Sequence, residues 1–266
     1  MKHSVVTTFN EAGYEVYGRR CIRSFIEFWP KEVDLHVITE DVEVVQSIAS
    51  NVKVFDQKDI NPRLIDFKNK FRSNPHATGF DPKGSNKQPS YLWDAVRFSN
   101  KVFAVTGLFE KISQQYDQLI WLDADTVTHS SVPLDFLDRF SPKNNQLTAY
   151  LNRSIYPECG WVGYNLRHEK ISAFMKRFEE VYTSGEFLNW VESHDSYVFW
   201  QVMKEFESQG CDWKALGDPS NRNHVFINSE LGAYMDHLKG PRKIAGRSRP
   251  TDLVKARKED WWKGMK

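Results

Sequence analysis

Apolar and polar positions follow two different periods in the first 55 residues. Residues 5–9, 33–39 and 52–55 are short runs rich in Val, Ile, Thr and Phe, a composition typical of strands. After the first run, apolar residues recur at spacings of three and four and predict a helix that ends near Pro30: Tyr14, Tyr17, Cys21, Phe25 and Phe28. Residues 42–49 have the pattern of a shorter helix. This alternation predicts an α/β fold with right-handed crossovers between parallel strands, as in nucleotide-binding sheets.

The patterns resume after a long loop. Residues 72–90 contain three Pro and two Gly without periodicity, which is typical of a surface loop and often of a functional one. A looser apolar stripe predicts a helix over residues 92–112, and residues 119–122 read as a buried strand. Amphipathic helices are predicted over residues 171–182 and 197–206.

Composition narrows the class of protein. Apolar residues make up 40% of the 266 residues and aromatic residues 14%, so the chain can fold around a core. The formal net charge is +1, which excludes a global field that attracts nucleic acid or anionic lipid. Apolar runs stay below the ~18 residues of a membrane span and Met1 leads into a strand without a signal-peptide pattern, so we expect a cytoplasmic protein. Three cysteines without C-x-x-C spacing indicate neither a disulfide framework nor a zinc site.

Positive charge gathers at the end of the chain. Residues 237–266 carry ten Lys or Arg against three Asp or Glu, and ten minus three leaves an excess of seven positive charges. We expect anions to be bound near this end. The Trp-bearing tail, Lys255–Lys266, also permits a non-enzymatic function in which the chain binds an anionic polymer or a membrane surface.

A pair of aspartates directly follows the predicted strand 119–122. Ligands of open α/β sheets bind beyond the carboxyl ends of the strands. Asp123 and Asp125 leave the strand two residues apart, so both carboxylates can turn toward one hard cation, such as one that carries a diphosphate. A polar turn with an Asp that caps a helix near Val132 is the alternative. The run also fits the first motif of haloacid-dehalogenase-like phosphatases, with Asp123 as nucleophile and Asp125 as acid/base.

Three segments together resemble the glycosyltransferases with a GT-A fold, in particular the retaining, glycogenin-like family. They are Thr7–Tyr14 (TTFNEAGY), Asp123–Asp125 (DAD) and His237–Lys243 (HLKGPRK), in the family's order and spread over most of the chain. In that family the D-x-D and the His of His-x-x-Gly-x-x-Lys hold a manganese ion on a nucleotide sugar. The resemblance implies a site for Mn²⁺ or Mg²⁺ made by three side chains: Asp123, Asp125 and His237.

The resemblance also assigns residues to the nucleotide sugar. It implies that Lys243 contacts the diphosphate, that Gly240 lets the backbone approach it, and that Ala124 lies between the metal ligands. An exposed basic turn is the alternative for this late motif. The first strand and its loop would hold uracil and ribose: Thr8, Phe9, Asn10 and Tyr14. Because Tyr14 also has the helical spacing of a core residue, base stacking and a core role both stay open for it.

The helix predicted over residues 92–112 carries two cationic side chains. Arg97 and Lys101 are four residues apart and share one face. The family has a basic residue that contacts the nucleotide sugar on the corresponding helix, so the resemblance implies this role for both. The alternative is a solvated face on which Asp94 is the ion-pair partner.

The sequence departs from the family in and near the catalytic region. Ile244-Ala245 stand where the family has Pro-Trp, Glu158-Cys159-Gly160 where it has Asn-Ser-Gly, and Asp195-Ser196 where it has Asp-Gln. We assign Asp195 to a sugar hydroxyl or the neighbourhood of the anomeric carbon, Glu158 to the sugar or the acceptor, and Lys243 to the departing diphosphate. The alternatives are a helix N-cap for Asp195 and a loop carboxylate for Glu158.

We therefore predict one GT-A-like α/β domain over residues 1–266, with a mostly parallel sheet and flanking helices. Residues 1–125 form the nucleotide-sugar half, residues 126–236 the sugar and acceptor half, and residues 237–266 a basic segment that closes on the diphosphate. The predicted activity is metal-dependent transfer of a sugar from a UDP-sugar to an unknown glycan, protein or small-molecule acceptor, with retention implied by the resemblance. The alternatives are the phosphatase, whose later acidic motif would be Gly217–Asn221, and the anionic-polymer-binding protein.

Overall fold

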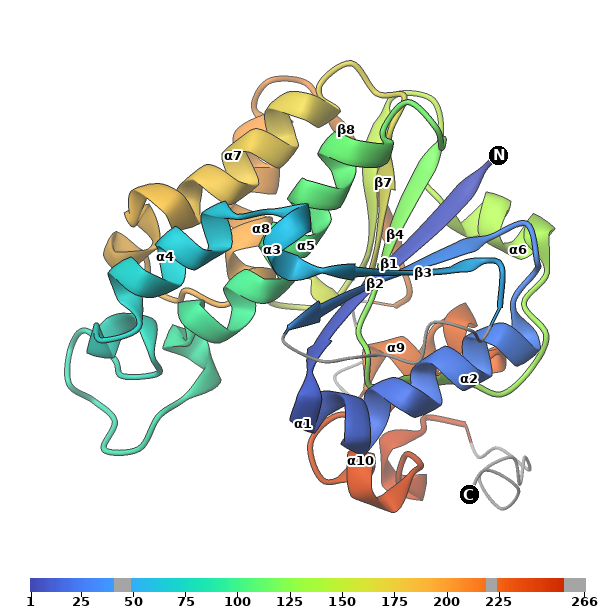
Figure 1. Cartoon of the computed structure of the whole chain (residues 1–266), viewed down its shortest axis with the longest axis horizontal. Helices are drawn as coiled ribbons and strands as arrows, with labels where there is room; N and C mark the ends of the chain where they lie inside the picture. Colours follow the sequence, from blue (N-terminus) through green and yellow to red (C-terminus); the bar gives the residue numbers. More distant parts are fainter. Residues whose placement is uncertain (41–48, 219–223, 256–266) are drawn as a thin grey trace.

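The computed structural model describes residues 1–40, 49–218 and 224–255. A seven-stranded sheet, in the order β3-β2-β1-β4-β7-β6-β8, runs through the molecule between two layers of helices (Figure 1). A second sheet consists of β5 and β9. The strands are β1 His3–Asn10, β2 Asp34–Glu40, β3 Val52–Asp56, β4 Gln118–Leu122, β5 Thr126–Thr128, β6 Gln146–Leu151, β7 Glu158–Asn165, β8 Asp212–Leu216 and β9 Met235–His237.

Most neighbouring strands of the large sheet are parallel. β3, β2, β1 and β4 run parallel, β7 pairs antiparallel with β4 and β6, and β8 pairs parallel with β6. The four strands expected from the sequence and the mostly parallel α/β class are confirmed. Because parallel strands end at the same edge of a sheet, β1 and β4 bring Asn10 and Asp123 to one side of the molecule.

Helices cover both faces of the sheet. α4, α5, α7 and α8 pack on one face, and α2, α6 and α9 pack on the other (Figure 1). The sheet has a hydrophobic core on each face, and successive strand residues point to opposite cores. Val5 packs in the core beneath α2, and Val6 packs in the core beneath α5. The helices are α1 Glu11–Gly13, α2 Arg19–Phe28, α3 Gln57–Ile60, α4 Arg63–Phe71, α5 Ala95–Ile112, α6 Leu134–Phe140, α7 Ile171–Ser184, α8 Asp195–Glu207, α9 Val225–Asn228 and α10 Arg242–Ala245.

The helix expected from Tyr14 onward forms, with a local change of winding. A π-helix over Tyr14–Gly18 precedes α2, and the Arg19 N–H donates to the Tyr14 carbonyl five residues back. A π-turn rotates the residues within it relative to an α-helical face, so apolar spacing no longer decides which side chain points to the core. α2 then ends at Phe28, close to the expected position.

The remaining predicted helices and the loop have mixed outcomes. α5, α7 and α8 confirm the helices expected over residues 92–112, 171–182 and 197–206. Residues 72–90 form a loop with one 3₁₀ turn. The helix expected over residues 42–49 lies outside the described residues except for its last position. The patterns missed α1, α3, α4, α9 and α10 and every strand after β4, and α6 was named only as a helix near Val132.

A histidine buried in the sheet predicts a pH-dependent stability. His36 on β2 is 1% exposed, its Nδ1 lies 2.9 Å from Ser4 Oγ, and burial together with Lys53 lowers its pKa from 6.5 to about 4. Because the folded state disfavours the imidazolium, stability is full above pH 6.5 and is lost as the pH falls toward 4. Lowering the pH from 7 to 5 should cost about 2 kcal/mol through this one group.

The measurement is urea unfolding at pH 7 and pH 5 for the wild type and His36→Asn, which keeps a polar side chain beside Ser4 but does not titrate. The variant should lose less stability than the wild type over this pH interval, whatever its stability at pH 7. Equal losses in both proteins would contradict the assignment to His36. The remaining histidines are the same in both proteins and cancel in the comparison.

Candidate active site

A short second sheet brings the late histidine beside the two aspartates. The Asp123 N–H donates to the Gly160 carbonyl over 2.9 Å, which fixes the turn at the end of β4. The chain continues into β5, where Thr126 pairs with His237 at the end of β9. The imidazole therefore lies next to the carboxylates although the two motifs are far apart in sequence.

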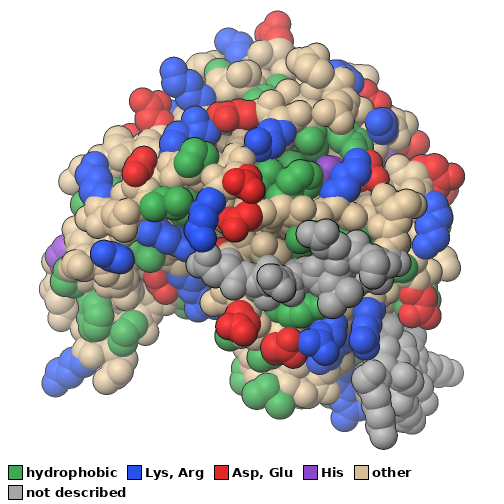
Figure 2. All heavy atoms as spheres, viewed as in Figure 1, with side chains coloured by type: hydrophobic (Ala, Val, Ile, Leu, Met, Phe, Trp, Pro, Cys, Tyr) green, Lys and Arg blue, Asp and Glu red, His purple; other side chains and the backbone are tan. Residues whose placement is uncertain are grey.

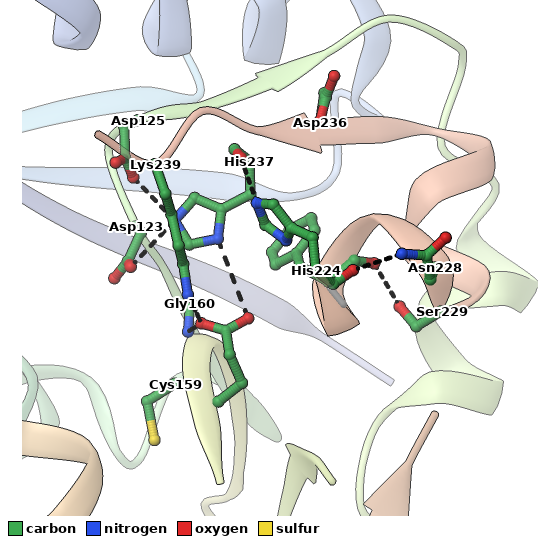
Figure 3. Close-up of polar contacts among 12 residues, drawn as sticks. Asp123, Asp125, Cys159, Gly160, His224, Asn228, Ser229, Asp236, His237 and Lys239 are labelled. Carbon is green, nitrogen blue, oxygen red and sulfur yellow. Dashed lines mark hydrogen bonds and ion pairs between the residues drawn. The ribbon is translucent and has the colours of Figure 1, made fainter. Parts of the chain in front are cut away.

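The three side chains converge on one point. His237 Nε2 lies 2.9 Å from Asp125 Oδ1 and 3.2 Å from Asp123 Oδ2 (Figure 3). One ligand atom from each residue lies within 4.8 Å of the other two. The His237 side chain is 1% exposed whereas Asp123 retains 29%, so the cluster is accessible from the Asp123 side.

The electrostatics keep both carboxylates charged. Burial raises the pKa of Asp123, but Lys101 and His237 outweigh it and hold the pKa well below its usual range. Burial also opposes the charge on Asp125, yet His237 lowers the pKa of this carboxyl to about 2. Burial disfavours the imidazolium of His237, while Asp125 and Asp123 raise its pKa to about 9. The aspartates are thus ionised at neutral pH, as ligands of a cation must be.

The donor set fits a divalent cation. Two carboxylate oxygens and one imidazole nitrogen suit Mn²⁺, once a cation displaces the proton from His237 Nε2, and the carboxylate oxygens suit Mg²⁺. Three protein ligands leave coordination positions for oxygens of a bound molecule. In the part of the chain that the structure describes, this is the one such group of three His, Cys, Asp or Glu residues.

Lys101 of α5 joins carboxylates from two elements. Its Nζ lies 2.7 Å from Asp195 Oδ2 on α8 and 3.4 Å from Asp123 Oδ1, and it donates to the Cys159 carbonyl. The ammonium also lies 4.8 Å from the ring centroid of Trp121. Burial opposes its charge, but Asp123 and Asp195 raise the pKa of Lys101. The alternative of a solvated face is therefore wrong for Lys101.

Arg97 and Asp195 lie in different surroundings. Arg97 is exposed, and Asp94 accepts a hydrogen bond from its backbone N–H rather than from its guanidinium. Asp195 does not cap α8, because the N-cap position belongs to His194 and Asp195 is the first residue of the helix. A capping role is also wrong for the Asp-Ala-Asp turn, since Pro133 occupies the N-cap of α6.

Glu158 is buried at the start of β7 and bound through one oxygen. Its Oε1 accepts from the Gly160 N–H over 2.9 Å and from Lys239 Nζ over 2.7 Å. Burial opposes its charge, but Lys239 and His237 lower the pKa of Glu158 to about 2. It is therefore not a solvated loop carboxylate. The neighbouring Cys159 is buried too, and burial raises the pKa of its thiol to about 12, which excludes a reactive thiolate at neutral pH.

Lys243 borders the cluster formed by Asp123, Asp125 and His237, a candidate metal site called the metal cluster below. Its Nζ lies 3.1 Å from Asp125 Oδ2 and 4.4 Å from the ring centroid of Tyr17. Its side chain is 22% exposed, so this ammonium is neither free in solvent nor fully buried. An exposed basic turn does not describe Lys243, although its neighbour Ile244 is 89% exposed.

A cavity of about 700 Å³ surrounds the cluster. It lies between segments from both ends of the chain, and Figure 2 shows the molecule hollowed along its lower edge. The same view shows Lys and Arg side chains interspersed with Asp and Glu, in keeping with a net charge of +1. The sequence-derived site residues that line the cavity are Thr8, Phe9, Asn10, Arg97, Lys101, Asp123, Ala124, Asp125, Glu158, Asp195, His237, Gly240 and Lys243.

Tyr14 requires a correction. It is buried in the α2 core, where its ring stacks on Phe9 with centroids 5.5 Å apart, and it is not among the residues that line the cavity. Tyr17 lines the cavity instead. The π-helix over Tyr14–Gly18 explains the exchange, because its wider turn sends Tyr14 to the core and Tyr17 to the cavity. The aromatic composition of this segment was visible in the sequence, but the winding was not.

The sequence did not indicate the roles of Gly160, which leaves space for the His237 ring, or of Lys239, which binds Glu158. A Cβ on Gly160 would lie 2.5 Å from His237 Cε1, so only glycine lets the imidazole approach β7 this closely. Lys239 lies inside the His-x-x-Gly-x-x-Lys motif and binds Glu158. Its place in that motif was the one available signal. His194 was not missed, since its place beside a helix start made it a weaker candidate; it lines the cavity, is buried, and its Nε2 lies 2.8 Å from Glu192 Oε2.

Comparison with solved structures identifies the fold. Mouse xyloside xylosyltransferase 1, in its apo form, is similar with a TM-score of 0.52 and 12% identity over 82% of this chain and 86% of that chain. A glycosyltransferase involved in the glycosylation of the major capsid of PBCV-1 is similar with a TM-score of 0.50 and 10% identity over 92% and 96% of the two chains. The chain therefore has the fold of GT-A glycosyltransferases.

Neither the protein-family models nor the curated protein sequences include a match to this chain. Among the described residues, the helices are too short or too polar to cross a membrane.

Proposed function

We propose that the chain is a metal-dependent glycosyltransferase that takes a UDP-sugar as donor. The observation that carries the proposal is the convergence of Asp123, Asp125 and His237 in a cavity beside the strand ends of a GT-A fold. These residues would hold Mn²⁺ or Mg²⁺, and the bound cation would supply positive charge to the diphosphate of the donor.

Lys243 supplies a second positive charge to the leaving group. Its ammonium already lies beside Asp125, at the edge of the metal cluster. Negative charge grows on the diphosphate in the transition state, so a contact with an ammonium strengthens there and lowers the barrier. Gly240 lines the same cavity with a φ of 58°, a conformation that favours glycine and lets the backbone come close to a phosphate.

The base and ribose occupy the end of β1 in this proposal. Thr8, Phe9 and Asn10 line the cavity there, and Tyr17 takes the aromatic role first assigned to Tyr14. Arg97 lines the cavity from α5, where an exposed guanidinium can bind an anionic donor. Residues 1–125 thus hold the nucleotide, residues 126–236 the sugar and acceptor, and the described part of residues 237–266 the diphosphate.

Asp195 is the carboxylate that we assign to the transferred sugar. It lines the cavity with its charge balanced by Lys101, so it can accept a hydrogen bond from a sugar hydroxyl. The family resemblance implies retention of the anomeric configuration and leaves the acceptor open among glycans, proteins and small molecules. ¹H NMR of the first product, through the anomeric coupling constant, tests retention directly.

Base selectivity gives the test of the donor. UDP with Mn²⁺ should stabilise the protein by about 2.7 kcal/mol at a hundred times its Kd, which thermal unfolding detects. ADP and GDP should displace UDP poorly, because a purine is larger than the uracil that this site is assigned to bind. If ADP or GDP displaced bound UDP as effectively as free UDP does, the assignment of UDP as the nucleotide would be wrong. If UDP stabilised the protein equally with and without metal, the proposed metal dependence would be wrong.

The surroundings of Asp123 do not favour the phosphatase alternative. Trp121 Nε1 donates to Asp123 over 2.6 Å, and Lys101 and His237 contact the same carboxylate. Because both oxygens of Asp123 already have partners, the carboxylate is poorly placed to attack a phosphate as a nucleophile. The later acidic motif of the phosphatase hypothesis falls largely on residues 219–223, outside the described residues. The tail of the polymer-binding hypothesis falls on residues 256–266, also outside them except for its first position.

A further inference from the structure

Two buried polar atoms next to the metal cluster face each other without hydrogen bonds. Glu158 Oε2 and His237 Nδ1 are 4.0 Å apart, and neither has a hydrogen-bond partner among the described residues. The side chains are 7% and 1% exposed, so bulk water does not serve them. Buried polar atoms ordinarily form hydrogen bonds, so two neighbouring buried atoms that form none need an explanation.

Each side chain is held through its other polar atom, Oε1 in Glu158 and Nε2 in His237. Glu158 is fixed through Oε1, which accepts from the Gly160 N–H over 2.9 Å and from Lys239 Nζ over 2.7 Å. The His237 ring directs Nε2 to the aspartates (Figure 3). Phe226 packs on this ring, with ring centroids 5.0 Å apart. The ring therefore presents Nε2 to the metal cluster and Nδ1 to Glu158.

We infer that Glu158 is a positioning residue whose Oε2 accepts a hydrogen bond from His237 Nδ1 when Nε2 binds the metal. This rests on the proposed function and replaces the sugar or acceptor contact first assigned to Glu158. A ligating imidazole keeps a lone pair on one nitrogen and carries its hydrogen on the other, and a carboxylate partner there fixes both the tautomer and the ring orientation. Closing the gap to hydrogen-bond length takes about 1 Å, a small rotation of either side chain.

Glu158→Gln breaks this contact with almost no change of shape. The amide oxygen must remain toward the Gly160 N–H, because an NH₂ group cannot accept from it. The NH₂ group then replaces Oε2 and meets the Nδ1–H group, donor against donor. Mn²⁺ binding, followed by electron paramagnetic resonance at a fixed UDP concentration, should weaken about 10–100-fold in Glu158→Gln.

Glu192→Gln is the matched control. Glu192 also pairs with a histidine, since its Oε2 lies 2.8 Å from His194 Nε2, but neither residue belongs to the metal cluster. This variant should bind Mn²⁺ within about twofold of the wild type, because it leaves the contacts of His237 intact. Equal weakening in both variants would show a general effect of removing charge and would overturn the inference.

A double-mutant cycle separates positioning from simple attraction between charges. If Glu158 acts through the imidazole, Glu158→Gln should have no further effect on Mn²⁺ affinity in a His237→Gln background. If it attracts the cation directly, the same fold-loss should appear in both backgrounds, which would refute the role. Histidine ¹⁵N NMR of the wild-type Mg²⁺–UDP complex needs no variant, and it should show the hydrogen of His237 on Nδ1. Finding it on Nε2 would also refute the role.

The outcomes distinguish this inference from the function beneath it. Wild-type protein that binds neither Mn²⁺ nor UDP would overturn the proposed function together with the positioning role. Wild-type protein that binds both, with Glu158→Gln indistinguishable from it, would overturn the positioning role alone and return Glu158 to the sugar or the acceptor.

Discussion

Asp125→Ala should abolish metal-dependent UDP binding. Its carboxylate lies 2.9 Å from His237 Nε2 and 3.1 Å from Lys243 Nζ, so it is the residue of the cluster that joins the proposed metal ligands to the proposed diphosphate contact. Replacing residues that merely orient a ligand typically costs 10–100-fold in metal affinity, so loss of a ligand itself should exceed about 100-fold. Calorimetric titration of Mn²⁺ and UDP measures the effect.

Asp135→Ala serves as the control for this substitution. Asp135 is exposed in the first turn of α6, and the aspartate to alanine change there removes the same charge away from the cavity. It should leave the Mn²⁺ and UDP affinities unchanged. Unchanged affinity in Asp125→Ala as well would show that the metal assignment is wrong.

Lys243→Met should lower turnover far more than donor affinity. The ammonium contacts Asp125 in the structure and is proposed to follow the diphosphate as charge develops during bond cleavage. By analogy with donors that stabilise an oxyanion, losing one such contact costs about 2.7–4 kcal/mol, or on the order of 10²–10³ in kcat. Steady-state kinetics of UDP release, with water as acceptor if needed, measure kcat and KM separately.

Lys255→Met tests whether position or total charge matters. Lys255 is exposed and belongs to the same basic C-terminal segment, so this variant removes an equal charge without touching the cavity. Its kcat should match the wild type. If Lys243→Met instead kept wild-type turnover and raised only KM, Lys243 would hold the donor without assisting bond cleavage.

Local sequence patterns predicted β1 to β4 and four of the helices, but not α3 and α4, which lie between β3 and α5. The strands of the parallel region and the helices α2, α5, α7 and α8 follow from apolar periodicity, because each spans enough residues for its buried face to repeat. The strand-end rule alone placed Asp123 and Asp125 at the ligand-binding edge of the sheet, where the cavity lies. β6, β7 and β8 were missed. The buried run of β7 contains two glycines, and β8 mixes exposed and half-buried residues with one buried residue, so neither shows a clear alternation.

The contacts of the site depended on tertiary structure. Arg97 and Lys101 share a helical face by spacing, yet only Lys101 is buried against Asp123 and Asp195, because α5 packs beside the ends of both β4 and α8. The sequence spacing did not show that Tyr17, and not Tyr14, lines the cavity. A π-turn changes the direction in which side chains point, and the order of residues does not reveal such a turn.

The sequence by itself determined the α/β class, the main helices and the candidate ligands, since these depend on local periodicity and on the chemistry of single side chains. Only the tertiary structure decided which of these groups meet. Glu158 had no visible partner in the sequence, whereas in the fold it faces His237 from β7 across a glycine that leaves the space for the ring. Burial and ion pairing are properties of contacts between distant segments, and no local pattern encodes the distance between two atoms on different strands.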